Sequence, residues 1–531
     1  GFTQLEGRTD SLTALIDRLT IELLRLGLVP TDAGYPVPNL ARATTASLLA
    51  LKAYLAGERD YRQGRWFPAA THFREAVEFD STFARAFYRL GWAMMWAGRG
   101  RKAADEYLVR AATLAAGLPV RDSLLLSVMN VGSNGSESAL RRLTIEYPDD
   151  ADGWLQMGEL RFHAGGADLR SPAEYRNAFE RAIALAPHYA EPYMHLLDDA
   201  FARLDSSRVR SLLDASGMDQ SEFCFGLVYD LRWGADTDRR RALAALDTLP
   251  AVAFRLAGRC DVMLVAADEV FEAAEPVRLA RLRPETPWLA ARVAFEQMSR
   301  GHLYRGEVRA ARAVVARAAD HPRLRHVADL AALTVRMSPY ADSSATSVAH
   351  RLVKTLPGGF GALRREFWLG LYAIDDGRER DLATSLEKLE TQSAAAATPR
   401  ADVIAAFPRV LRTYAALKQG DLDRLRDFEA AQRVFVGLFG NEGAFLRYDV
   451  GLLLLEARRF DDAERYFLSL YPDSWYYVPA QYQLGRVYEA LGQREKAREH
   501  YRIFVEWWND ADPELQPWVE EGRAGLARMG G

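Results

Sequence analysis

Three residues in the first half of the chain have the types and spacing of a metal site. His188, Glu191 and His195 recur at intervals of three and four, which would place imidazole and carboxylate ligands on one face of a helix. Structural zinc usually recruits a more closely supported set of ligands, and a helical face that carries His and Glu is more often a solvated one. We therefore expect no metal ligand here.

Other motifs associated with catalysis are incomplete. The glycine-rich segment Gly358–Gly361 has no lysine and serine following it in phase and no strand pattern before it, so a turn after Pro357 is the simpler interpretation. Cys224 and Cys260 stand 36 residues apart, which is not the spacing of a metal or redox motif. The motifs of protein kinases are missing from the sequence as well. We expect no catalytic residue and no cofactor, and hence not an enzyme.

The composition favours an all-helical body. Apolar residues make up 49% of the 531 residues, the net charge is −4, and Ala, Leu, Arg and Glu, which are good helix formers, are abundant. Arginine provides 62 of the 68 basic residues, a bias typical of a GC-rich bacterial genome. These cations are interspersed with acidic residues, so no nucleic-acid partner is expected. The sequence has no apolar run of 18 residues that could span a membrane.

The same residue types recur 34 positions apart near both ends of the chain. In the N-terminal part, four positions repeat: Gly57, Gly64, Ala69 and Phe73 are followed by Gly91, Gly98, Ala103 and Tyr107. In the C-terminal part, three repeat: Gly451, Ala463 and Phe467 are followed by Gly485, Ala497 and Tyr501. We expect each first glycine to let one helix approach the alanine of the next, with the aromatic residue filling the gap between repeats.

This period resembles that of the tetratricopeptide (TPR) repeat, a pair of antiparallel helices. The resemblance implies an all-α fold, a right-handed α-solenoid of TPR-type helical hairpins. The runs from Ala41 to Phe73 and from Tyr482 to Gln516 are similar to the C-terminal TPR region of bacterial membrane-anchored serine/threonine kinases and of TPR-containing transcriptional regulators. In the kinases these repeats lie outside the cytoplasm, which favours a periplasmic location, with the cytoplasm as the alternative. Membrane association would come only through a segment absent from this chain.

Five segments are expected along the chain. They are an N-terminal amphipathic helix and linker (1–45), N-terminal TPR repeats (46–200), degenerate helical repeats (201–440), C-terminal TPR repeats (441–512) and a capping helix (513–531). The third N-terminal unit has a turn lengthened by five residues around Gly165–Asp168, which we expect to be a surface loop. Helical spacing of apolar residues continues through Val308–Ala319 and Asp402–Lys418.

The TPR resemblance also implies a ligand surface, because the first helix of each hairpin lines the concave wall. The inward positions of the first three units, counted from Ala50, Ala84 and Ala151, are rich in aromatic residues and arginine, the types that concentrate binding energy at interfaces. The expected partner-binding residues are Tyr54, Tyr61, Arg62, Arg85, Tyr88, Trp92, Trp96 and Phe162. The alternative is that Trp92 and Trp96 pack in the core.

The predicted function is that of a non-catalytic scaffold for protein–protein interaction or sensing. It would serve a bacterial signalling or membrane-associated assembly by binding a peptide or a partner subunit in the concave groove. The alternative is a small-molecule-sensing or catalytic domain with a pocket in 201–440. The oligomeric state is left open.

Overall fold

The computed structural model describes most of the chain after residue 44. The described residues are 45–97, 101–115, 118–127, 133–218, 225–248, 266–283, 286, 288–319, 324, 354, 360–394, 401–436 and 440–530. The expected N-terminal helix, both cysteines and the glycines at 358 and 359 lie outside them. Every regular element in these ranges is a helix, and no strand occurs there, which confirms the all-α prediction.

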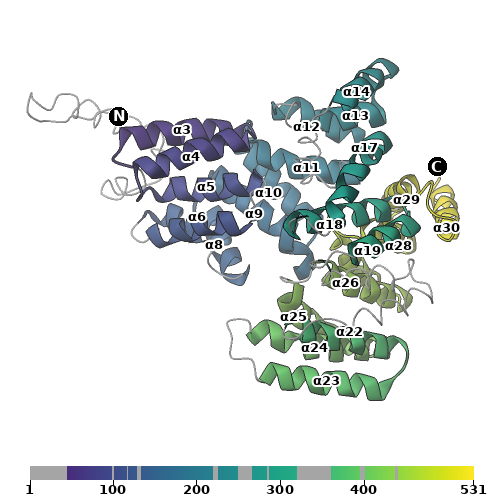
Figure 1. Cartoon of the computed structure of the whole chain (residues 1–531). Helices are drawn as coiled ribbons and strands as arrows, with labels where there is room; N and C mark the ends of the chain where they lie inside the picture. Colours follow the sequence, from purple (N-terminus) through teal and green to yellow (C-terminus); the bar gives the residue numbers. More distant parts are fainter. Residues whose placement is uncertain are drawn as a thin grey trace, which may run out of the picture. The chain divides into compact units, whose positions relative to one another are not determined.

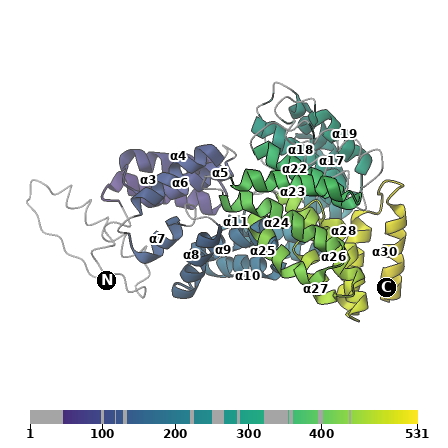
Figure 2. The same ribbon diagram turned by 90° about the horizontal axis from the view of Figure 1, so that it is seen from below.

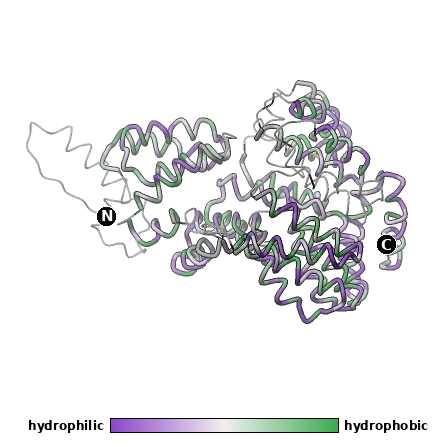
Figure 3. The backbone as a smooth tube through the Cα atoms, turned by 60° about the horizontal axis from the view of Figure 1, so that its bottom comes forward, coloured by the Kyte–Doolittle hydropathy of each residue, from purple (hydrophilic) through white to green (hydrophobic). Residues whose placement is uncertain are grey.

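Contacts group the chain into two units. The first consists of Gly1–Leu160, Tyr175–Leu197 and Ser207–Gly226, and the second of Arg161–Glu174, Asp198–Ser206 and Leu227–Gly531. The grouping does not test the five segments expected from the sequence, which stay a prediction. Hydrophilic and hydrophobic residues alternate along the helices (Figure 3), so each helix has an apolar face to bury against its neighbours.

The first unit is a series of helices joined by short turns. Consecutive helices lie side by side from α3 to α6 (Figure 1). The bounds, including three helices that continue into the second unit, are α3 (Leu48–Arg62), α4 (Trp66–Phe79), α5 (Ala84–Trp96), α6 (Arg101–Leu114), α7 (Val120–Ser127), α8 (Ser133–Glu146), α9 (Ala151–Ala164), α10 (Pro172–Leu185), α11 (Ala190–Ala202) and α12 (Ser206–Ser216).

The second unit continues the pattern of paired helices. Its helices are α13 (Phe225–Trp233), α14 (Asp236–Thr248), α17 (Asp268–Leu279), α18 (Trp288–Tyr304), α19 (Val308–Ala319), α22 (Phe360–Asp375), α23 (Glu379–Ala394), α24 (Ala401–Lys418), α25 (Leu425–Val436), α26 (Gly440–Glu456), α27 (Phe460–Leu468), α28 (Tyr477–Ala490), α29 (Arg494–Trp507) and α30 (Gln516–Arg528). Short 3-10 helices are η2 (Gly165–Asp168), η4 (Ala280–Leu282) and η6 (Leu422–Arg424). Figure 2 shows α26, α27 and α28 packed in succession. The two helices expected in the irregular centre are confirmed as α19 and α24.

A glycine on the first helix of each regular hairpin faces a ring on the second. A Cβ atom built on that glycine would lie 2.4–2.8 Å from a ring carbon, closer than any side chain tolerates. The pairs are Gly57 with Phe73, Gly158 with Phe179, Gly451 with Phe467 and Gly485 with Tyr501. The expectation that the alanine meets the glycine and the aromatic fills the gap between repeats is therefore wrong. The ring lies against the glycine of its own hairpin and fixes the distance between the two helices. The fold is an all-α solenoid of tetratricopeptide-type hairpins.

The spacing between glycine and ring explains two departures from the repeat. Phe179 follows Gly158 by 21 residues, whereas the other three pairs are 16 residues apart, so the inserted five residues leave the contact intact. In the second hairpin, Gly91 faces Leu108 and not Tyr107. The predicted position of Tyr107 is wrong by one residue. Leu108 is 3% exposed, whereas Tyr107 is partly exposed and stacks on Phe87.

The five-residue insertion is not the surface loop that we expected. It forms η2, and its two glycines are buried. A Cβ atom on Gly166 would lie 2.5 Å from the carbonyl oxygen of Ser469. The absence of a side chain allows the backbone to approach this closely, and the insertion packs inside the second unit.

Aromatic residues hold the end of the second unit together. Trp508 is fully buried, and its indole N–H donates to the carbonyl oxygen of Leu303 at 3.2 Å. The Tyr304 hydroxyl donates to the carbonyl oxygen of Pro472 at 2.5 Å. The expected capping helix is α30, whose Gly525 lies against the ring of Tyr501 on α29.

The register of the second hairpin can be tested with neighbouring substitutions. Leu108→Ala removes the side chain that faces Gly91 and leaves a cavity, so the free energy of unfolding should fall by about 2–4 kcal/mol. Tyr107→Ala serves as the matched control and should cost less than about 1 kcal/mol, because that ring is partly exposed. Urea denaturation measures both values. A larger loss for Tyr107→Ala would restore the register expected from the 34-residue period.

Candidate functional site

Charged residues of the first unit gather on the first helices of its hairpins. Glu58 lies on α3, Arg85 and Arg89 lie one turn apart on α5, and Asp152 lies near the start of α9. A spacing of four places the two arginines on the same face of their helix. The stacking of hairpins brings these faces together, because helices that are distant in sequence occupy equivalent places in successive repeats.

Arg89 is the centre of this cluster. Its guanidinium is 2% exposed, forms an ion pair with Glu58, and donates to Asp152 at 2.8 Å and to the Tyr189 hydroxyl at 3.1 Å. The same hydroxyl donates to Asp152 at 3.0 Å. The guanidinium also lies 5.0 Å from the ring centroid of Tyr61. These bonds satisfy a cation that would otherwise be costly to bury.

The cluster keeps its carboxylates ionised. Burial alone would raise the pKa of Asp152, but nearby arginines, with Arg89 first among them, hold this pKa well below its usual range. Burial also opposes the charge of Glu58, and Arg89 and Arg62 again lower the pKa. The guanidinium of Arg62 lies 5.3 Å from the ring centroid of Tyr189. The result is a network of paired charges within the stack.

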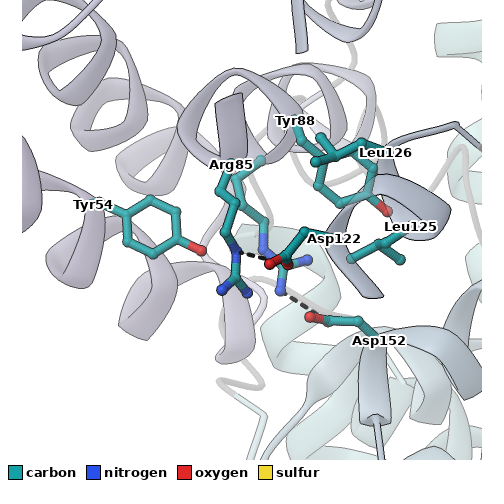
Figure 4. Close-up of a pocket in the computed structure, with 8 residues that line it drawn as sticks. Tyr54, Arg85, Tyr88, Asp122, Leu125, Leu126 and Asp152 are labelled. Atoms are coloured by element: carbon teal, nitrogen blue, oxygen red, sulfur yellow. Dashed lines mark hydrogen bonds and ion pairs between the residues drawn. The ribbon is translucent and has the colours of Figure 1, made fainter. Parts of the chain in front are cut away.

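A hollow opens beside this network (Figure 4). It holds about 220 Å³, part of it open to solvent, and its walls are Tyr54, Arg85, Tyr88, Arg89, Asp122, Leu125, Leu126 and Asp152. The side chain of Arg85 is 27% exposed, and its ion pair with Asp122 is long at 3.8 Å. Asp122 is also bound at 2.7 Å by Arg121. Arg85 is therefore the cation of this wall with the weakest internal pairing.

The hydroxyl of Tyr88 has an unusual environment for a buried polar group. Tyr88 is 3% exposed, and its hydroxyl makes no hydrogen bond to any residue in the described ranges. The Trp92 indole N–H acts on this phenol as a donor that lowers its pKa, but the two groups do not reach hydrogen-bonding geometry. Burial is the larger effect and raises the pKa of Tyr88. A protonated donor thus lies at the wall of the hollow, beside Arg85.

Glu191 occupies a second polar position, on α11. It is fully buried and accepts hydrogen bonds from the Tyr61 hydroxyl at 2.8 Å and the Trp96 indole at 2.5 Å. Burial, and then the charge of Glu159, raise the pKa of Glu191 to about 8. The Nε2 atom of His195 lies 2.5 Å from Glu159. His188 is exposed in the turn before α11. The structure therefore directs the three residues of the possible metal site to different partners.

Seven of the eight predicted partner-binding residues lie in the first unit, and their role stays a prediction. Tyr54, Arg85 and Tyr88 line the hollow. Tyr61 and Trp96 bind Glu191, Arg62 packs on Tyr189, and Trp92 lies edge-on to Tyr88. Phe162 belongs to the second unit, where it lies edge-on to His163. The six aromatic residues are each less than 10% exposed, so the two arginines are the more accessible members.

Sequence reasoning missed several residues of the site. Arg89 lies one residue away from an inward position, although its spacing of four from Arg85 places it on the same face. Asp122, Leu125 and Leu126 come from α7, in a segment without a recognisable repeat. Tyr189 lies just before α11 and reaches the cluster through its hydroxyl. Only the period of an intact third repeat would have indicated these partners.

Solved structures of repeat proteins resemble this chain at low sequence identity. The APC/C hetero-tetramer Cut9–Hcn1 aligns at 12% identity over 89% of this chain and 96% of that chain, with a TM-score of 0.26. The TPR domain of P58(IPK) aligns at 14% identity over 91% and 99%, with a TM-score of 0.17. The human IFIT1 dimer with m7Gppp-AAAA aligns at 12% identity over 95% and 96%, with a TM-score of 0.24. No protein-family model matches the chain, and neither does any curated protein. Superpositions this loose carry no information about function.

The raised pKa of Glu191 predicts a pH dependence of stability. A carboxyl whose pKa is about 8 in the folded state and ordinary in the unfolded state stabilises the fold at acid pH. That contribution is complete below about pH 4.5 and is lost as the pH rises through 8. Glu191→Gln cannot ionise, so between pH 5 and 8 the wild type should lose at least about 1 kcal/mol relative to it. Thermal unfolding across this range measures the difference, and parallel pH profiles of the two proteins would show that Glu191 ionises normally.

Proposed function

We propose that this chain is a non-catalytic interaction module that binds a peptide or a partner subunit through the wall formed by α3, α5 and α7. The observation that carries the proposal is the hollow beside Arg85. There a weakly paired guanidinium and a buried hydroxyl without a hydrogen bond lie beside Leu125 and Leu126. Polar groups left without partners in a concave place are satisfied when a ligand supplies the complement.

The chemistry of the hollow favours an acidic side chain next to an apolar one. Arg85 can offer a bidentate donor to a carboxylate, and the Tyr88 hydroxyl can donate a further hydrogen bond. The two leucines offer an apolar surface to the neighbouring side chain of the ligand. Aromatic residues and arginine at such a place concentrate binding energy with little loss of conformational entropy. The fully exposed segments of the partner would then contribute little.

The charge pattern supports a protein ligand over a nucleic acid. The arginines around Arg89 are each matched by a carboxylate of the cluster, including Glu58, Asp122 and Asp152. A polyanionic backbone would have to displace these carboxylates, whereas binding of nucleic acid normally requires an excess of cations. A short acidic motif engages Arg85 without disturbing the network.

The resemblance of the two ends of the chain to repeats of bacterial kinases and regulators supports a place in a signalling or membrane-associated assembly. We propose a periplasmic location, as in the membrane-anchored kinases, with the cytoplasm as the alternative. None of the helices within the described ranges has the length and apolar character needed to cross a membrane.

The proposal predicts that binding and folding respond separately to two conservative substitutions. The whole chain is used to select peptides from a random 12-residue library, and affinities are measured by fluorescence polarisation. Arg85→Gln should weaken the selected peptides by about tenfold, the value of a charge-assisted hydrogen bond. Tyr88→Phe removes only the hydroxyl and should weaken them several-fold, with little change in melting temperature.

Arg110→Gln is the matched control. Arg110 is an exposed arginine on α6 of the same unit, so its loss should leave the peptide affinities unchanged. If selected peptides bind Arg85→Gln and Tyr88→Phe as tightly as wild type, the hollow is not the binding site.

A further inference from the structure

Arg447, on α26 of the second unit, is a buried cation without a counterion. Its side chain is 5% exposed, and its Nε and Nη1 atoms make no hydrogen bond to any residue in the described part of the chain. Burial lowers the pKa of Arg447 to about 10, so the group is still charged at neutral pH. Burying an isolated guanidinium costs several kcal/mol, and folded proteins normally supply a partner for such a group.

The insertion η2 covers this guanidinium. A Cβ atom on Gly166 would lie 3.4 Å from the Nη2 atom of Arg447 and 2.5 Å from the carbonyl oxygen of Ser469. Two successive glycines therefore bring bare backbone against the side chain. The Tyr471 hydroxyl closes the other end of the insertion by donating to the carbonyl oxygen of Arg170 at 2.8 Å.

The carboxylates around η2 are already engaged by other arginines. Glu174 is shared by Arg161 at 3.5 Å and Arg170 at 3.3 Å. Asp168 is shared by Arg433 at 2.9 Å and Arg170 at 4.0 Å. Counting the buried guanidinium, four cations surround the insertion with two carboxylates between them. This part of the fold carries an excess of positive charge.

Two further buried side chains beside Arg447 have polar atoms that lack partners. Tyr466, on α27, is fully buried, and its hydroxyl makes no hydrogen bond within the described ranges. The charge of Arg447 reaches this phenol, although burial, the larger effect, raises the pKa of Tyr466 well above the usual value. Gln432, on α25, is 1% exposed, and both atoms of its amide lack a hydrogen bond among the described residues. The donors thus come from three helices that follow one another in the second unit.

We propose that Arg447 and the Tyr466 hydroxyl hold a small oxyanion, a carboxylate or inorganic phosphate, beneath the glycines of η2. A guanidinium matches the geometry of either ion through paired N–H donors, and a phenol adds a third. The single uncompensated charge corresponds to one negative charge on the ligand. Because the side chains are almost completely buried, the ion fits only as a small molecule and not as part of a polymer.

This site is independent of the peptide-binding proposal. It lies in the second unit, and all of its residues are distinct from those around Arg85. The bound anion would stabilise the contact between η2 and the helices α25 and α26, because an ion that binds only the folded state adds its binding free energy to stability.

The test measures the melting temperature of the whole chain in increasing sodium phosphate or sodium acetate, at ionic strength kept constant with sodium chloride. One of the two anions should raise the melting temperature of the wild type along a saturable curve, by roughly 3 °C at a hundredfold excess over its dissociation constant. Whichever anion acts at the lower concentration identifies the oxyanion. Arg447→Gln and Tyr466→Phe should reduce the shift at least several-fold.

Arg433→Gln is the control, because that arginine is exposed on the neighbouring helix and pairs with Asp168; its response to the anion should equal that of wild type. If Arg447→Gln does not fold, the wild-type isotherm by calorimetry and the Tyr466→Phe variant decide the question. The proposal is overturned if neither anion shifts the wild type. It is equally overturned if both variants respond as strongly as wild type, since the ions then act elsewhere.

Discussion

The contact between a glycine and a ring within one hairpin is the constraint on which the rest of the structure depends. The pair occurs in both units, as at Gly57 with Phe73 and at Gly451 with Phe467. Because the ring occupies the place of a missing side chain, the two helices approach closely and the first helix turns its other face to the neighbouring repeat. The five-residue insertion after Gly158 is tolerated because it lengthens the turn and leaves this contact in place. The period of 34 follows from repeating the contact, and a single shift of register occurs where leucine replaces the ring.

Close stacking has an electrostatic consequence, because charged side chains on the inner faces are brought into the interior. Around Arg89 this charge is neutralised by carboxylates from α3 and α9, and such a network specifies which helices meet. Around η2 the balance fails, since Arg447 retains its charge without a carboxylate among the described residues. The first arrangement leaves a weakly paired arginine at the edge of a hollow, suited to a peptide. The second leaves a fully enclosed cation, suited to a small ion.

The sequence predicted the parts of the fold that repeat and failed where a contact has no period. The positions of Gly57, Gly91, Gly451 and Gly485 on the first helices, and the helices α19, α24 and α30, follow from spacing alone. Tyr107 was misplaced because the turn before α6 adds one residue that periodicity cannot detect. The burial of Gly166 depends on Ser469, 303 positions away, and no local pattern reports such a contact. For the same reason Arg85 and Tyr88 were identified on the inner wall, whereas Asp122 and the pairing of Arg89 with Asp152 were not.

A double-mutant cycle on the contact between Gly451 and Phe467 tests this account most directly. Gly451→Ala places a methyl group against the ring and should lower the free energy of opening of α26 and α27, measured by hydrogen–deuterium exchange, by about 1–3 kcal/mol. Phe467→Leu should cost about 1 kcal/mol alone. In the double variant the smaller side chain makes room for the methyl group, so the two losses should fall short of their sum by at least about 0.5 kcal/mol. Additive losses would contradict the account, because the glycine would then not set the distance between the helices.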